Sequence, residues 1–174
     1  MRGTRTLRIK AVVTSRADIG DLLTAPGDAV LVERGRPRLL VLACPCGCGE
    51  IYPVNLDHRA GQAWRLYGDN RRGFSLFPSV WRDTGCESHF IVWRDQIYVL
   101  GPFEDDLEAL QTDEASQLLD NVRAKLSREL TSFSAIADAI QAVPWDVLLI
   151  CRRLVRMGIA EEGDGDERAM FRQK

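Results

Sequence analysis

The chain has 174 residues, of which 45% are hydrophobic and 28% charged, and its net charge is −2 at pH 7. This composition is typical of a soluble globular protein. No run of about 18 apolar residues is present, which argues against a membrane-spanning helix, and the overall charge does not by itself predict nucleic-acid binding.

The two halves of the chain differ in charge and in hydrophobic period. Residues 1–103 carry 14 Lys/Arg against 10 Asp/Glu, whereas residues 104–174 carry 9 against 15. Such asymmetry indicates two units with different surfaces. We therefore predict an α+β protein with an antiparallel, β-rich domain at 1–102 and a helical domain at 103–174.

The β-rich domain is expected from short apolar runs separated by turn residues. The segment DAVLVERGRPRLLVLAC (28–44) reads as a hairpin around Gly35 and Pro37. EIYPVNL (50–56) follows as a strand in which Pro53 favours a sheet edge or a bulge. GFSLFPSVW (73–81) and SHFIVWRDQIYVL (88–100) supply further strands, the second with a turn near Arg94 and Asp95.

The helical domain is expected from apolar residues at helical spacing. DLEALQTDEASQLLDNVRAKLSREL (106–130) predicts a first helix. Ser134 is placed to cap a short second helix, and Pro144 suits the first turn of a third. Gly158 follows that helix where a left-handed cap is favourable. GIAEEGDGDERAMF (158–171) predicts two strands joined by a Gly-rich tip.

Three cysteines within five positions, in CPCGCG (44–49), indicate a shared partner. The N-terminal sequence MRGTRTLRIKAVV lacks the apolar stretch of a signal peptide, so we expect a cytoplasmic protein, in which dense cysteines bind metal rather than form disulfides. Cys86 and His89, in GCESHF, form a C-x-x-H pair that suits the second half of a tetrahedral site. We therefore predict bound zinc.

The first half of this site has three candidate ligands. Gly47 and Gly49 flank Cys48 and permit the positive φ that thiolate-binding turns need. The pair Cys44 and Cys48 therefore has the best turn chemistry, and Cys46 is the alternative.

Four suitable ligand residues are present, and a fifth is available as an alternative. They predict a structural metal site with a closed coordination shell, which does not activate water. The H-x-E element of the zinc deaminases is absent. His58 and Asp57, in NLDHRAG, are most simply a surface turn, and Cys151 lies on the apolar face of a helix. We therefore expect no catalysis, with a zinc-dependent hydrolase as an alternative.

The segments CPCGCGEIYPVNLD, AWRLY and SLFPSVWRDTGCESHFIVW resemble a bacterial family of small zinc-binding domains with a C-P-x-G-C-G … C-x-S-H-F pattern. The resemblance implies Cys44, Cys48, Cys86 and His89 as ligands, although Cys46 is an addition to the pattern. It also implies an accessory role beside bacterial ubiquitin-like conjugation components, in defence against phage.

The segment IADAIQAVPWDVLLICRRLVRMGIAEEG (136–163) resembles a winged helix-turn-helix. The resemblance implies that Arg152, Arg153 and Arg156 lie on its second helix, which enters the major groove in DNA-binding members. The acidic tip EEGDGDE would face DNA unfavourably, so protein contact is favoured over nucleic acid.

These observations lead to one main hypothesis and one runner-up. The main hypothesis is a non-catalytic adaptor whose zinc-stapled domain binds a protein partner. The runner-up is a DNA-binding regulator that uses the winged-helix-like unit. Trp and Arg are frequent interface anchors, so the candidate contacts in the first domain are Trp64, Arg65, Trp81 and Arg82.

Overall fold

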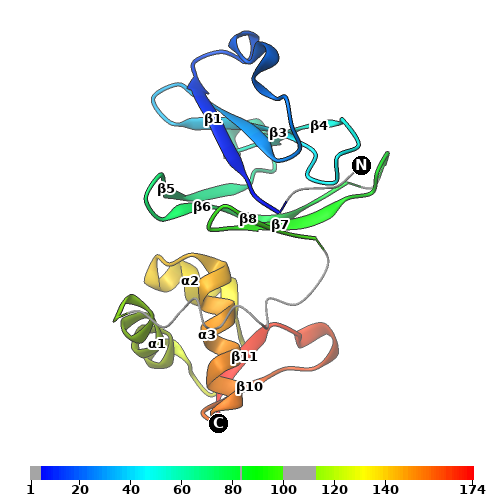
Figure 1. The fold of residues 1–174 in the computed structure, drawn as a ribbon. Coiled ribbons are helices and arrows are strands. Elements are labelled where there is room, and N and C mark those ends of the chain that lie inside the picture. The colour runs from blue at the N-terminus through cyan, green and yellow to red at the C-terminus, as the bar shows by residue number, and fades with distance from the viewer. Residues whose placement is uncertain (1–4, 83, 100–112) are drawn as a thin grey trace. The chain divides into compact units, whose positions relative to one another are not determined.

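The computed structural model describes residues 5–82, 84–99 and 113–174. The chain divides into two compact units, unit 1 at Met1–Gly101 and unit 2 at Pro102–Lys174. Among these residues, unit 1 is built of strands with short 3₁₀ turns, and three α-helices lie in unit 2 (Figure 1). The predicted α+β class, with strands first and helices after, is confirmed.

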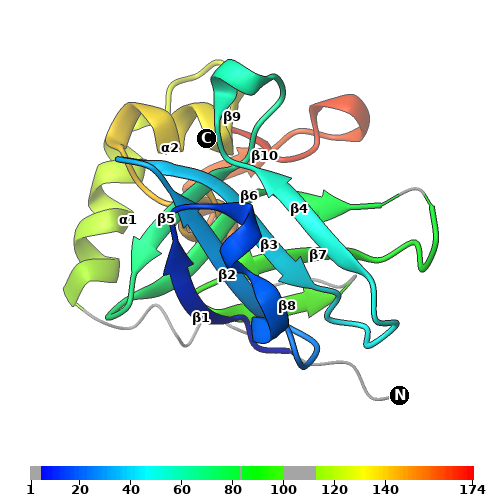
Figure 2. The ribbon, with the colours of Figure 1, turned by 90° about the horizontal axis from the view of Figure 1, so that it is seen from above.

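The first sheet of unit 1 contains β1 (Arg8–Val13), β2 (Asp28–Glu33), β3 (Pro37–Ala43) and β4 (Ile51–Asn55), in that order. The β2–β3 hairpin is the predicted one, and β4 is an edge strand that tolerates Pro53. β1 runs parallel to β2, which departs from the expected antiparallel arrangement. Two short 3₁₀ turns, Arg16–Asp18 and Gly20–Leu22, belong to the connection between them. Figure 2 shows β1 and β4 at opposite edges.

The second sheet has the order β5 (Arg65–Asp69), β6 (Gly73–Trp81), β7 (His89–Trp93) and β8 (Gln96–Val99), and every neighbouring pair is antiparallel. A 3₁₀ turn at His58–Ala60 precedes β5. The β7–β8 turn falls at Arg94 and Asp95, as predicted, and both residues have positive φ. The sequence analysis did not identify β1 or β5.

A single apolar core joins the two sheets of unit 1, which Figure 1 shows as stacked layers. Strand alternation directs one face of each sheet into this core. The first sheet contributes Leu40, Leu42 and Val54, and the second contributes Leu76, Val80, Phe90 and Val92, all at most 4% exposed. Cys44 is a member of the same core.

Unit 2 places three helices against a small sheet. Its elements are α1 (Asp113–Lys125), β9 (Thr131–Ser132), α2 (Phe133–Ile140), α3 (Pro144–Arg156), β10 (Ala160–Glu162), a 3₁₀ turn at Gly165–Glu167, and β11 (Met170–Gln173). The sheet order is β10-β11-β9. Pro144 begins α3 and Gly158 follows it with φ +72°, as predicted. The first part of the predicted first helix, 106–112, lies outside the described residues.

Ser132, rather than Ser134, caps α2. Its side-chain oxygen accepts a hydrogen bond from the Ala135 N–H at 3.2 Å, while its backbone is extended. The core of unit 2 includes buried side chains from all three helices and from β11: Val122, Ile136, Val147, Ile150, Cys151, Leu154 and Phe171. Cys151 is therefore a core residue, as expected.

Within the described residues no single helix has the length and apolarity needed to cross a bilayer; α2 and α3 meet the criterion only when joined across a bend of 116°.

Candidate functional site

The segment between β3 and β4 forms a tight loop that gathers three sulfur atoms. The Cys44 N–H donates to the Glu50 carbonyl at 2.8 Å, and the Gly47 N–H donates to the Cys44 carbonyl at 3.1 Å. Gly47 and Gly49 have φ of +85° and +86°. Glycine adopts this region at no steric cost, and the positive φ expected at both glycines is confirmed.

The side chains of Cys44, Cys46, Cys48 and Cys86 form one cluster, and their sulfur atoms all lie within 4.8 Å of one another. The Cys44 sulfur is 3.2 Å from that of Cys46 and 3.6 Å from that of Cys86. Thiolates around a tetrahedral ion at 2.3 Å would lie about 3.8 Å apart. The donor set and its spacing therefore fit a thiophilic metal ion, and the four cysteines could hold one.

Hydroxyl groups surround the sulfur of Cys86. The Ser88 Oγ lies 3.2 Å from it and 3.5 Å from the Cys44 sulfur, and the Tyr52 hydroxyl lies 3.0 Å from it. Burial raises the pKa of Tyr52 above its ordinary value, so its hydroxyl stays protonated and donates. These contacts stabilise a thiolate at Cys86.

The thiols of the cluster compete for ionisation. The Ser88 hydroxyl, with Tyr52, lowers the pKa of Cys86 to about 6. For Cys48, the Glu50 N–H lowers the pKa, but desolvation and the neighbouring thiols outweigh it and raise the pKa to about 12. Adjacent negative charges oppose one another. A cation is therefore needed before all four sulfurs can be thiolates together.

The turn that carries Cys86 is held against the first sheet by a second contact. The Arg82 guanidinium lies 3.2 Å from the Glu50 carboxylate and stacks 5.3 Å over the Tyr52 ring. Gly85 has φ +71° and its backbone lies close to the Glu50 side chain. A Cβ at this position would be 2.5 Å from Glu50 Oε1. The two loops that supply the sulfurs are thus joined by polar and packing contacts as well.

His89, a predicted metal ligand, is not among the side chains that cluster at the sulfurs. Its Nε2 lies 2.9 Å from the Ser79 Oγ. Both residues are half-buried, and the Trp81 ring lies 6.2 Å from the imidazole, centroid to centroid. A serine hydroxyl within hydrogen-bond distance of an imidazole is the arrangement in which histidine can accept the serine proton.

The strand geometry explains why Ser79 and His89 meet. His89 is directly opposite Trp81, and Ser79 precedes Trp81 by two positions, so all three share one face of the sheet. Val80 and Phe90 pair on the opposite face, inside the core. The register shifts between Leu76 and Val80, and such bulges redirect side chains.

The sequence analysis did not identify Ser79 as a candidate. Ser79 and His89 are ten positions apart and carry no local motif, and only the β6–β7 pairing brings them together. The dipeptide Pro-Ser in SLFPSVW is part of the family resemblance, but the resemblance assigned no chemical role to its serine.

The structure gives the predicted contact residues of unit 1 different environments. Trp64 is half-buried against the core, and its Nε1 donates to the Ser79 carbonyl at 3.1 Å, whereas Trp81 is 68% exposed. Arg65 is exposed on β5, and Arg82 is engaged with Glu50 and Tyr52 as described above.

The predicted contact residues of unit 2 lie along α3. Arg156 is exposed, and Arg152 and Arg153 are half-buried. The Arg152 Nε lies 3.9 Å from the Glu162 carboxylate on β10, while Arg172 pairs with Glu161 at 2.8 Å. Carboxylates from the C-terminal strands therefore offset part of the positive charge.

Fold and site together define unit 1 as a two-sheet β-domain with a four-cysteine cluster and an adjoining serine–histidine pair. Residues 15–100 match the model of a family described as "Bacterial ubiquitination-like system serine protease (BubE)". The match supports the association with bacterial ubiquitin-like systems that the resemblance implied. Comparison with curated proteins and with solved structures found no significant match.

Proposed function

We propose that unit 1 is a serine-type hydrolase of a bacterial ubiquitin-like system, with Ser79 as nucleophile and His89 as general base. The observation that carries the proposal is the 2.9 Å separation of Ser79 Oγ and His89 Nε2 on a half-buried sheet face. The family description, which names a serine protease and matches the segment containing both residues, supports it.

The pair supplies a nucleophile and a general base for acyl transfer. His89 Nε2 removes the Ser79 hydroxyl proton as Oγ attacks a substrate carbonyl carbon, and the imidazolium then returns that proton to the leaving amine or alcohol. The resulting acyl-serine is hydrolysed by water, which His89 deprotonates in turn, restoring the serine. The substrate class is an ester or amide of a protein in the ubiquitin-like system.

We further propose that the four-cysteine cluster binds zinc and that this metal is structural. Four thiolates form a closed shell, which leaves no ligand position for a substrate. The Ser88 hydroxyl contacts the cluster, and the next residue is His89. A metal held by the cysteines would therefore fix the start of β7 and, with it, the position of the imidazole. In this arrangement His89 remains free for catalysis.

For unit 2 we propose a winged-helix module that binds a protein. Two features support it: the order β9-α2-α3-β10-β11, and the bend of 116° between α2 and α3 across a turn of three residues. Protein contact is favoured over DNA because Glu161 and Glu162 lie close to the arginines of this surface. In this proposal the adaptor role predicted for the whole chain belongs to unit 2.

A fluorophosphonate probe tests the nucleophile without knowledge of the natural substrate. The full chain should be labelled at Ser79, as mapped by peptide mass spectrometry, and Ser79→Ala should abolish labelling. His89→Ala should slow labelling by about 100-fold or more. Ser15→Ala, which removes a capping serine elsewhere in unit 1, should label normally. Labelling that persists in Ser79→Ala, or no labelling of a folded and metal-loaded chain, would refute the proposal.

A further inference from the structure

A cavity of about 360 Å³ opens on unit 1 between the start of β3, the loop after β4, and β5. Its walls include the apolar side chains of Leu56, Trp64 and Leu66, and its polar groups include Arg36 and Arg65. The size is at the lower end of the range for small-ligand sites. Among the described residues that line it, none carries a carboxylate.

The positive charge of Arg36, which lines this cavity, is only partly neutralised by its surroundings. The Asp57 carboxylate forms ion pairs with Arg36 at 2.8 Å, with Arg59 at 3.1 Å, and with Arg38. One carboxylate therefore faces three guanidinium groups. The Arg36 side chain uses Nη2 for Asp57 and remains 40% exposed, so its other N–H donors are available.

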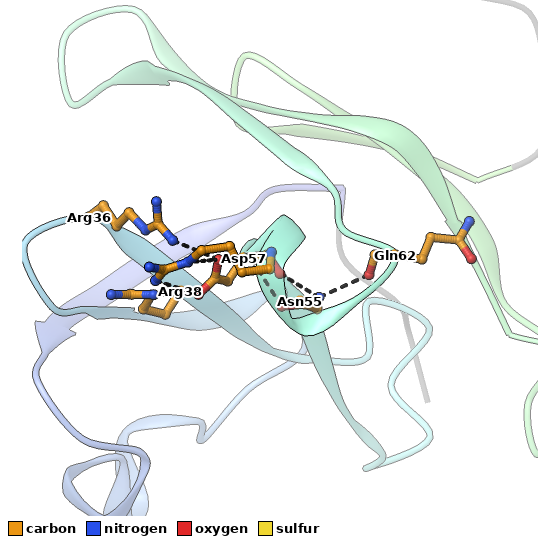
Figure 3. A network of polar contacts seen from close by, with 6 residues as sticks. Arg36, Arg38, Asn55, Asp57 and Gln62 are labelled. Atoms are coloured by element: carbon orange, nitrogen blue, oxygen red, sulfur yellow. Dashed lines mark hydrogen bonds and ion pairs between the residues drawn. The ribbon is translucent and has the colours of Figure 1, made fainter.

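The loop that carries Asp57 is itself held in place, as Figure 3 shows. The Asn55 side-chain amide donates to the carbonyls of Asp57 and Gln62 at 3.2 and 2.9 Å, and its Oδ1 accepts from the Asp57 N–H at 3.0 Å. Asp57 in turn fixes the Arg36 guanidinium. A cation that is already oriented loses less entropy when a ligand binds.

The cavity is linked to the proposed nucleophile through a single side chain. Trp64 forms part of its wall, and the Trp64 Nε1 donates to the backbone carbonyl of Ser79 at 3.1 Å. Arg65, the next residue, pairs in register with Phe77, two positions before Ser79. A ligand in the cavity would therefore contact the residue that supports the Ser79 backbone.

We propose that this cavity binds a carboxylate-bearing residue of the peptide that unit 1 hydrolyses. The guanidinium groups of Arg36 and Arg65 would receive the carboxylate, and the apolar walls would cover the aliphatic part of the same residue. The carboxylate is either an acidic side chain or a free chain terminus. This inference rests on the proposed function only for the role of the peptide as substrate, because binding itself requires no catalysis.

The test uses the full chain carrying Ser79→Ala, labelled with ¹⁵N and loaded with zinc, so that binding is observed without turnover. The Trp64 indole N–H is one of four indole resonances and is assigned with Trp64→Phe. Three peptides are titrated: acetyl-AALEA-amide, the neutral acetyl-AALQA-amide, and acetyl-AALQA with a free terminal carboxylate. At least one anionic peptide should shift the Trp64 indole resonance and bind more tightly than the neutral one.

The arginine variants make the result specific to the cavity. Arg36→Gln and Arg65→Gln should each weaken binding of the anionic peptide by about tenfold, the loss expected for one charge-assisted hydrogen bond. Arg71→Gln, on the exposed β5–β6 turn, should bind normally. Equal binding of the three peptides, or unchanged affinity in both arginine variants, would overturn the inference. Serine labelling by the fluorophosphonate probe is a separate result, so either proposal can fail alone.

Discussion

The identity of the fourth metal ligand can be decided with two substitutions, Cys46→Ala and His89→Ala. A structural zinc site contributes roughly 10–16 kcal/mol of folding free energy, so one of four ligands contributes about 3 kcal/mol. Unit 1 spans Met1–Gly101, and in a unit of this size a loss of about 3 kcal/mol lowers Tm by about 12 °C or more. Because the Cys46 sulfur lies 3.2 Å from the Cys44 sulfur, within the cluster, we expect this loss of stability for Cys46→Ala.

The assay measures metal per chain by mass spectrometry and thermal unfolding on the same anaerobic samples. Cys46→Ala should lose most of its zinc and show the lower Tm, whereas His89→Ala should retain one zinc because its imidazole pairs with Ser79. Cys151→Ala is the control for metal content, since Cys151 belongs to the core of unit 2 and is not a member of the cluster. Full zinc in Cys46→Ala together with zinc loss in His89→Ala would refute the four-cysteine site.

Two further predictions concern the stability of unit 1. Burial raises the pKa of Asp28, but hydrogen bonds from Arg8, Ala25 and Thr24 outweigh it and the pKa is lowered. Its stabilising contribution is therefore present above the unfolded-state pKa and is lost as pH falls through the folded-state value. Asp28→Asn should cost about 1–3 kcal/mol at pH 7 and flatten the acid dependence of the urea midpoint; an unchanged acid dependence would contradict this. Gly85→Ala should destabilise more than Gly35→Ala in parallel urea titrations: both glycines have φ near +70°, but only at Gly85 does the added Cβ meet a neighbour, the Glu50 carboxylate. Equal losses would show that the contact with Glu50 is unimportant.

Local signals in the sequence were sufficient for much of the fold. Pro53 indicated an edge strand, and Pro144 and Gly158 marked the two ends of α3, because each residue restricts or relaxes its own backbone. The strand pairing of β1 was not predictable in the same way. Its partner β2 begins 15 residues after β1 ends, across two 3₁₀ turns, and no local pattern specifies a parallel pairing.

The cysteine cluster was predictable in outline but not in its full membership. The density of cysteines identified the loop, and Cys86 identified the second loop. Which sulfurs converge depends on how the loop packs against the turn that carries Cys86, a long-range contact in which Arg82 pairs with Glu50. In the closed loop Cys46 lies with the other sulfurs, so the three cysteines of the loop, at alternate positions, all reach the cluster.

The position of His89 follows from the two-residue period of a strand. Cys86 lies in the turn, Ser88 points toward the sulfurs, and Phe90 points into the core. The residue between Ser88 and Phe90 must therefore point to the other face. A C-x-x-H motif presents both ligands to one ion only when a turn continues through the histidine; here β7 begins at His89, and the imidazole lies beside Ser79 instead. The same alternation that removes His89 from the sulfur cluster supplies the proposed base for Ser79.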